Sequence, residues 1–389
     1  MHHTFSIPTA FPNMHAKLNA FLCVGLLAIA VAPIRAIEPI GDDSELFITG
    51  VATVAENDNI FLNHSNTTSA TVFDLVPGLS YEFGKNNALT KGLLAANEDF
   101  QIFSKSGSSL NNQLANIVGS LAYDDTKTKL NFDASFHQAD QAQVGIQNLG
   151  YLVDRNLYHM GGTGEVAMTD KSSLGTGILF DDTDYRAVGF TDYRYVELPV
   201  NYYFKFEPKL DLSAGFRYRD NTVGTGGIDS TDLFYNVGAR GEFTPNLTGE
   251  LLVGYQQQNL DNGTNQGGLG LDSRFTYVYD TKTSLSFGVN DDFSYVATGP
   301  AIREFEVYLE ASTALTEQWS IDGRVSYNRY TYITTPQRDD YYTARVGVTY
   351  VIATYLKVSA AYSYAEDNSN LTIASFKNNI ISVSASVHY

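Results

Sequence analysis

The chain has 389 residues, with 43 Asp and Glu against 25 Lys and Arg, and a formal net charge of −18 at pH 7. This acidic balance excludes nucleic acid as a partner, because too few basic side chains are present to replace the counterions on phosphate. Only 17% of the residues are charged, while Tyr (26), Phe (23) and Gly (32) are abundant. Such a composition favours a protein whose outer surface lies partly out of water.

Residues 1–36 are predicted to be a secretory signal peptide. Lys17 precedes a short apolar stretch, and Ala36 suits the cleavage position. The stretch is too short to span a bilayer comfortably. Residues 1–13 do not look like the start of a signal, so Met14 is the alternative initiator.

Cleavage leaves residues 37–389 as the mature chain, which we expect to be exported through the periplasm. It would contain no cysteine, because Cys23 is the only one in the sequence. No disulfide or thiolate site is then available. The mature chain also has no apolar run of about 18 residues, so no helical membrane span is predicted.

One pattern returns throughout the mature chain: a polar turn, then Leu or Trp, then alternating apolar and polar residues. Within each repeat the apolar residues keep a period of two, which excludes helical repeats. A propeller would need four short strands per repeat, whereas each repeat here fits two long strands. The anchor residues are Leu89, Leu130, Leu174, Leu210, Leu247, Leu285, Trp319 and Leu356.

These repeats predict an all-β protein, a transmembrane antiparallel up-and-down β-barrel of about 18 strands with no plug domain. Eight tight turns alternate with nine longer polar connections, as in outer-membrane barrels. The connections are too short for a loop to fold inward as a large constriction. The predicted strands are 45–62, 71–84, 89–104, 111–125, 129–140, 153–169, 173–186, 193–206, 210–223, 230–243, 247–259, 269–280, 284–297, 302–315, 319–332, 338–352, 356–368 and 377–389.

Each strand has an apolar and a polar face. In 210–219 the apolar face holds Leu212 and Phe216, and the polar face holds Arg217 and Arg219. A soluble sandwich would alternate as well, but these strands are long and their apolar faces begin and end in aromatic residues, which suits lipid interfaces. The polar faces should line a water-filled lumen. The lumen candidates are Arg217, Arg219, Arg240, Arg274, Arg324, Arg345, Asp211, Asp292, Glu304, Glu306, Glu310 and Asp322.

Two interpretations of these charges stay open. They could be solvated wall residues that balance one another, as is usual in such barrels. Alternatively, Glu304, Glu306 and Glu310, with Asp292 on the neighbouring strand, could form an acidic strip that selects cations or binds sugar hydroxyls.

No catalytic, cofactor or metal motif stands out, so an enzyme is not predicted. The clusters "ENDN" at 56–59 and "EDN" at 366–368 could bind a divalent cation at the outer rim or could simply be solvated acidic loops.

The chain ends in "IISVSASVHY", a strand pattern closed by an aromatic residue. We expect this strand to pair with the first one, so that no edge remains in the membrane. Tyr389 resembles the terminal aromatic that is read by the outer-membrane assembly machinery.

The repeats, the opening "TGVATVAENDNIFL" at 49–62 and the aromatic end resemble the putative β-barrel porin type 2 group of outer-membrane proteins. The resemblance implies a barrel in outer-membrane lipid and a link to exopolysaccharide secretion, and it supplies no catalytic residues or cofactor. The function expected is a porin-like channel for small hydrophilic solutes with a mild cation preference. The alternative is a barrel for exopolysaccharide export, with polysaccharide and periplasmic export partners.

Overall fold

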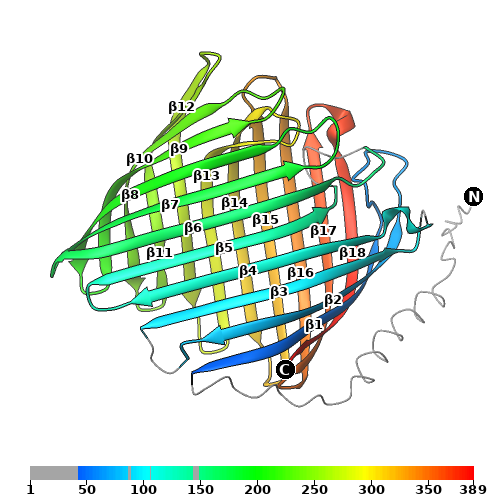
Figure 1. The fold of residues 1–389 in the computed structure, drawn as a ribbon, viewed down its shortest axis with the longest axis horizontal. Coiled ribbons are helices and arrows are strands. Elements are labelled where there is room, and N and C mark those ends of the chain that lie inside the picture. The colour runs from blue at the N-terminus through cyan, green and yellow to red at the C-terminus, as the bar shows by residue number, and fades with distance from the viewer. Residues whose placement is uncertain (1–42, 86–88, 106, 143–148) are drawn as a thin grey trace, which may run out of the picture.

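The computed structural model describes residues 43–85, 89–105, 107–142 and 149–389. The predicted signal peptide, 1–36, and Met14 lie outside the described residues. The described chain forms 18 antiparallel strands in one closed sheet, so the predicted fold class is confirmed (Figure 1). The described residues include no helix that is long and apolar enough to cross a membrane.

Consecutive strands pair with each other around the ring. In Figure 1 the strands β1 to β7 of the near wall run across β13 to β17 of the far wall. The strands are β1 (Ser44–Asn57), β2 (Ala70–Phe83), β3 (Thr90–Phe103), β4 (Asn112–Asp124), β5 (Thr128–Asp140), β6 (Asp154–Thr169), β7 (Ser172–Tyr185), β8 (Tyr193–Glu207), β9 (Leu210–Val223), β10 (Ser230–Thr244), β11 (Leu247–Leu260), β12 (Asn265–Val278), β13 (Thr283–Tyr295), β14 (Ala301–Ala314), β15 (Trp319–Tyr332), β16 (Arg338–Ala353), β17 (Leu356–Ser369) and β18 (Phe376–His388).

The barrel closes between its first and last strands, as predicted. β1 and β18 pair from Thr49 opposite His388 to Asn57 opposite Ile380. The last residue completes this ladder, because Tyr389 and Ile48 exchange two backbone hydrogen bonds of 2.8 and 3.0 Å. No free edge therefore remains at the junction of β1 and β18, as expected.

The alternation places the large apolar side chains on the outside. On β9, Leu212 and Phe216 are each 42% exposed, whereas Ser213 and Arg219 on the opposite face are each 7% exposed. Lipid can take the place of water around such an outer face, which leaves the polar face to the interior.

Several short turns are fixed by side chains in their own sequence. Asp125 accepts hydrogen bonds from the backbone N–H of Lys127 and Thr128, and Asp280 accepts from Lys282 and Thr283. These donors hold the pKa of both carboxyls below its usual value. Because the bonds are local, the turn positions can be predicted from the sequence.

The first connection departs from the sequence prediction. The strand expected over 45–62 ends at Asn57, and the apolar residues that follow it are buried in the connection to β2. Ile60 and Phe61 pack with Ala70 in a small apolar cluster. The apolar residues therefore extend beyond the end of the strand, which is why the predicted strand was too long.

The "ENDN" segment ties this connection to the last strand. Asn59 is fully buried, and its amide nitrogen donates to the carbonyls of Asn63 and Lys377 at 2.9 and 2.8 Å. Asp58 accepts hydrogen bonds from the backbone and side-chain nitrogens of Asn379, both at 2.7 Å. In the structure these residues fasten the first connection to the closing strand.

Candidate functional site: a constriction inside the barrel

Ion pairs between strands that are not neighbours identify the interior face. Arg219 on β9 reaches Asp292 on β13, and Arg240 on β10 reaches Glu165 on β6. Side chains on the convex outer face diverge and could not meet across three intervening strands. The predicted lumen residues in these pairs therefore point into the barrel.

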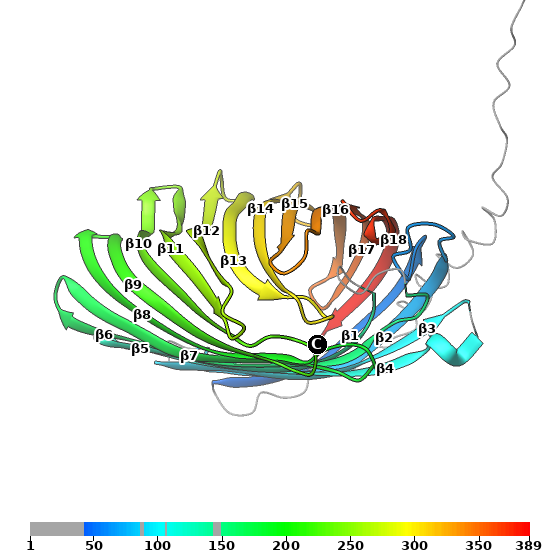
Figure 2. The same cartoon turned by 90° about the horizontal axis from the view of Figure 1, so that it is seen from above.

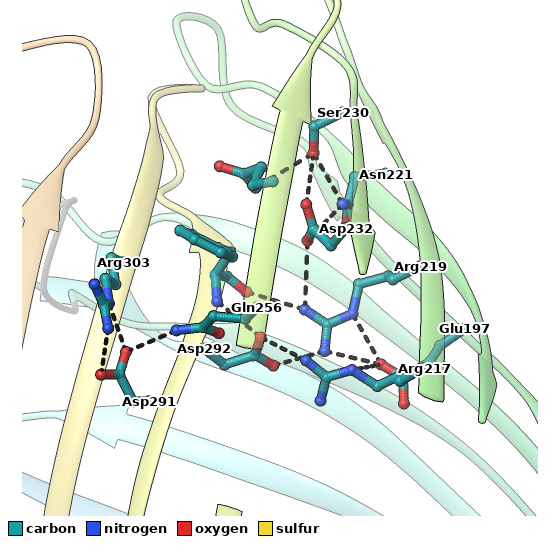
Figure 3. A network of polar contacts seen from close by, with 12 residues as sticks. Glu197, Arg217, Arg219, Asn221, Ser230, Asp232, Gln256, Asp291, Asp292 and Arg303 are labelled. Atoms are coloured by element: carbon teal, nitrogen blue, oxygen red, sulfur yellow. Dashed lines mark hydrogen bonds and ion pairs between the residues drawn. The ribbon is translucent and has the colours of Figure 1, made fainter. Parts of the chain in front are cut away.

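The densest interior network joins β8, β9, β10 and β13 (Figure 3). Asp292 accepts from Arg217 at 2.6 Å and from Arg219 at 2.8 Å. Glu197 accepts from the Nε of Arg219 at 2.9 Å, and Asp232 lies 3.8 Å from the same guanidinium. Arg219 is only 7% exposed, so its charge depends on these partners.

A second group surrounds Arg240. Its guanidinium lies 2.7 Å from Glu165 and 3.3 Å from Asp211. It also lies 3.3 Å from the centre of the Tyr203 ring. Both carboxylates and the ring stabilise the positive charge, so this predicted arginine is also neutralised locally.

A third group lies on β14, β15 and β16. Arg324 on β15 contacts Glu306 at 3.3 Å and Glu310 at 3.5 Å, and it covers the Tyr308 ring. Next to it, Arg345 on β16 pairs with Asp322 on β15. Arg274 is exposed on β12.

The structure does not gather the predicted acidic strip into one free surface. Asp292 is engaged by two arginines, and Glu306 and Glu310 share Arg324. Glu304 differs, because it hydrogen-bonds Tyr330 and has no ion-pair partner among the described residues. Most of these charges therefore pair with one another, and Glu304 is the exception within the strip.

The hydrogen bonding of the barrel wall is interrupted between β12 and β13. Their ladder stops at Leu271 opposite Asp291, although both strands continue. β13 and β14 remain paired as far as Tyr295 opposite Ala301. The outer part of the β13–β14 hairpin thus leaves its neighbour β12 while keeping its own hydrogen bonds.

Polar side chains bond the free backbone carbonyls at this break, and Figure 3 shows three of them, Arg303, Gln256 and Arg219. Arg303 and Gln256 donate to the carbonyl of Leu269 at 2.8 and 3.1 Å. Arg219 donates to the carbonyl of Phe293 at 3.0 Å. Backbone groups that lose a strand partner must find another one, and here arginine and glutamine side chains supply it.

The tip of this hairpin reaches connections of other strands. The backbone N–H of Thr191, between β7 and β8, donates to the carbonyl of Ala297 at 2.8 Å. The hydroxyl of Tyr295 donates to the carbonyl of Ile228, between β9 and β10, at 2.9 Å. Ala297 also packs against Val153, which precedes β6. Figure 2 shows β13, drawn in yellow, bending toward the inside of the ring.

The tip of the hairpin therefore lies against the connections that lead into β6, β8 and β10. The sequence predicted that no loop is long enough to fold inward as a large constriction; the inward element here is a pair of strands, which that prediction did not consider. The lengths of the loops can be estimated from the sequence, but they do not reveal where a strand separates from its hydrogen-bonded neighbour.

A chamber of about 480 Å³ remains beside the hairpin. Its lining residues come from segments that are far apart in the chain, and they include four tyrosines and one carboxylate. These residues are Tyr185, Tyr295, Tyr330, Tyr341 and Glu304. Aromatic walls with a few polar groups are typical of sites that hold small ligands.

Sequence reasoning missed the residues at the wall break. Asp291 and Arg303 lie on the apolar parity of their strands, and they form an ion pair at 2.7 Å. Both charged residues occupy strand positions whose side chains would otherwise face lipid. This was the sequence signal that this part of β13 and β14 does not follow the barrel wall.

Residues 205–389 match the family model described as putative beta-barrel porin 2, the same family that the sequence motifs resemble. None of the curated proteins matches the chain.

Among solved structures, OpdQ of Pseudomonas aeruginosa is 14% identical, with a TM-score of 0.46 over 89% of this chain and 98% of that one. OpdK of the same organism is 9% identical, with a TM-score of 0.47 over 90% and 100%. OccAB4 of Acinetobacter baumannii is 10% identical, with a TM-score of 0.46 over 90% and 99%. Residues 205–389 therefore match the putative beta-barrel porin 2 family, and in the structure they lie within one closed 18-stranded antiparallel sheet.

Proposed function

We propose that the chain is a porin-like channel of the outer membrane that passes small hydrophilic solutes with a mild preference for cations. The observation that carries this proposal is the chamber beside the β13–β14 hairpin. Its volume of about 480 Å³ suits small solutes. No Lys or Arg is among its described lining residues, whereas Glu304 is. A carboxylate without a basic partner attracts cations and repels anions.

In this proposal the mature chain is exported through the periplasm, and its terminal Tyr389 is recognised by the assembly machinery. Tyr389 lies at the end of the closing ladder and packs edge-on against Tyr355, with ring centres 5.4 Å apart. The last strand is thus the segment whose pairing closes the barrel.

Exopolysaccharide export is the alternative. A polymer would have to pass the constriction, so this function requires the β13–β14 hairpin to move away from the connections it contacts. We therefore prefer the small-solute channel for the arrangement seen here.

Single-channel recording in planar bilayers tests the proposal. The purified barrel should give stable conductance, and a salt gradient should give a reversal potential displaced toward that of the cation. A barrel that inserts but conducts nothing, or that prefers anions, would overturn it. If deletion of the gene also removes surface polymer, export becomes the better description.

A further inference from the structure

Three tyrosines in the interior of the described chain are each covered by an arginine. The pairs, with the distance from the guanidinium carbon to the ring centre, are Arg240 with Tyr203 at 3.3 Å, Arg219 with Tyr195 at 4.9 Å and Arg324 with Tyr308 at 4.6 Å. Each guanidinium also forms an ion pair with at least one carboxylate. A guanidinium held between a ring face and a carboxylate is stabilised by both. The barrel therefore repeats one arrangement of tyrosine, cation and carboxylate.

The chamber beside the β13–β14 hairpin holds two parts of this arrangement. Glu304 on β14 lies directly opposite Tyr330 on β15, and the two side chains are hydrogen-bonded. The ring of Tyr341 on β16 lies next to that of Tyr330, with ring centres 6.4 Å apart and planes inclined by 38°. All three residues line the chamber. A carboxylate and two aromatic rings therefore border the same space.

The third part of the arrangement, the cation, is not supplied by the protein. No Lys or Arg is among the described lining residues, and the described part of the chain places no basic side chain over the rings of Tyr330 and Tyr341. Arg303 precedes Glu304, but it lies on the other face of β14 and pairs with an aspartate at 2.7 Å. Arg329 precedes Tyr330 and likewise pairs with an aspartate, at 2.9 Å. Both arginines are therefore engaged outside the chamber.

We propose that this chamber binds a small organic cation whose head is a guanidinium group, in the place that an arginine takes at the three other tyrosines. The charge of the solute pairs with the Glu304 carboxylate, and its planar face lies on the ring of Tyr330 or Tyr341. A volume of about 480 Å³ accommodates such a head group with a short chain attached to it. The inference rests on the proposed function, because it names the class of cation that the channel selects.

Two properties favour a guanidinium over other small solutes. It is planar and carries several N–H donors, so it can stack on a tyrosine ring while it donates to a carboxylate, and it is more weakly hydrated than an ammonium group. A neutral planar solute stacks in the same way but gains nothing from the charge of Glu304. Charge and shape can therefore be tested separately.

The test measures binding by isothermal titration calorimetry to the folded full-length barrel in detergent, at about pH 8 so that carboxyl groups carry their charge. Methylguanidinium chloride is the probe, and methylurea is the matched neutral solute of similar planar shape. Wild-type protein should bind one methylguanidinium and should bind methylurea at least about tenfold more weakly, because a hydrogen bond to a charged group is worth more than one between neutral groups.

Two variants locate the site. Glu304→Gln should weaken methylguanidinium binding by about tenfold or more, and Tyr330→Leu by about threefold or more. Glu310→Gln is the matched control on the same face of β14, because Glu310 already pairs with Arg324, and it should bind like the wild type. If Tyr330→Leu does not fold, Glu304→Gln and the comparison with methylurea still decide.

The inference is overturned if wild-type protein binds no methylguanidinium, if it binds methylurea equally well, or if Glu304→Gln binds the probe as tightly as the wild type does. Because binding is measured in detergent, it does not require conduction. Conductance without binding would overturn this inference and leave the channel function standing, whereas binding without conductance would do the reverse.

Discussion

The guanidinium of Arg219 lies 2.8 Å from the carboxylate of Asp292, although three strands separate β9 from β13 along the sheet. The contact exists because the outer part of β13 has left β12 and bends into the lumen. The same guanidinium donates to the carbonyl of Phe293, which follows Asp292. One arginine therefore holds both the side chain and the backbone of the constricting hairpin.

Asp292→Asn should release this hairpin. Arg217 and Arg219 would keep only Glu197 and Asp232 as acidic partners, and removing one partner of a buried ion pair costs about 3–5 kcal/mol. We expect larger single-channel conductance and more frequent transitions between levels. Arg345→Gln, which breaks an ion pair of the barrel wall away from the hairpin, is the control and should leave the conductance pattern unchanged. Equal conductance of Asp292→Asn and wild type would show that the network does not hold the constriction.

A cysteine pair at Thr191 and Ala297 should fix the hairpin in place, because the backbones of these residues are hydrogen-bonded at 2.8 Å. The mature chain predicted from the sequence has no cysteine of its own, so the pair would be unique. Conductance should be low after oxidation and should rise after reduction.

The matched control for that experiment is a cysteine pair at Thr53 and Ser384, which face each other in the ladder between β1 and β18. Oxidation of this pair should not alter conductance. If oxidation at 191 and 297 also has no effect, the hairpin does not move during conduction.

Glu304→Gln should weaken the cation preference. Glutamine keeps the shape of the side chain and can still bond Tyr330, but the charge without a basic partner is lost. The reversal potential in a salt gradient should move toward zero. Glu310→Gln is the comparison, because Glu310 belongs to the group around Arg324. The opposite ranking, with a larger change for Glu310→Gln, would contradict the role given to the chamber.

Asn59→Ala should destabilise the barrel closure. The side chain is fully buried and makes hydrogen bonds to Asn63 and Lys377, each of which contributes about 1 kcal/mol. The loss should total about 2–3 kcal/mol, visible as a lower temperature for the shift of the folded band in gel electrophoresis. Thr67→Ala, at an exposed position of the same connection, should have little effect. An unchanged transition temperature for Asn59→Ala would mean that this connection does not stabilise the closure.

Removal of Tyr389 should reduce the amount of folded barrel in the outer membrane, if the assembly machinery reads this residue. Tyr355→Ser removes the ring that Tyr389 packs against while keeping the terminal aromatic. Immunoblots of outer-membrane fractions should show a loss for the deletion and near-normal levels for Tyr355→Ser. Similar losses in both variants would indicate a packing role and not a recognition signal.

The sequence alone determined the barrel wall. Alternation in each strand separates Leu212 and Phe216 from Arg217 and Arg219, and local hydrogen bonds at Asp125 and Asp280 set the turns. The alternation and the turn bonds each involve residues that are close in sequence. The number of strands and the closure by β18 could therefore be predicted. The end of β1 could not, because Ile60 and Phe61 are buried by packing against Ala70 and not by strand pairing.

Only the tertiary structure decided which interior charges meet. The alternation of polar and apolar residues predicts that Arg219 faces the lumen. It does not predict that Asp292 is its partner, because the two residues meet only where β13 separates from β12. The balance between ladder hydrogen bonds and the side-chain bonds of Arg219, Arg303 and Gln256 is set by groups far apart in the chain. The constriction arises from such distant contacts, whereas strand periodicity reports only the face on which each residue lies.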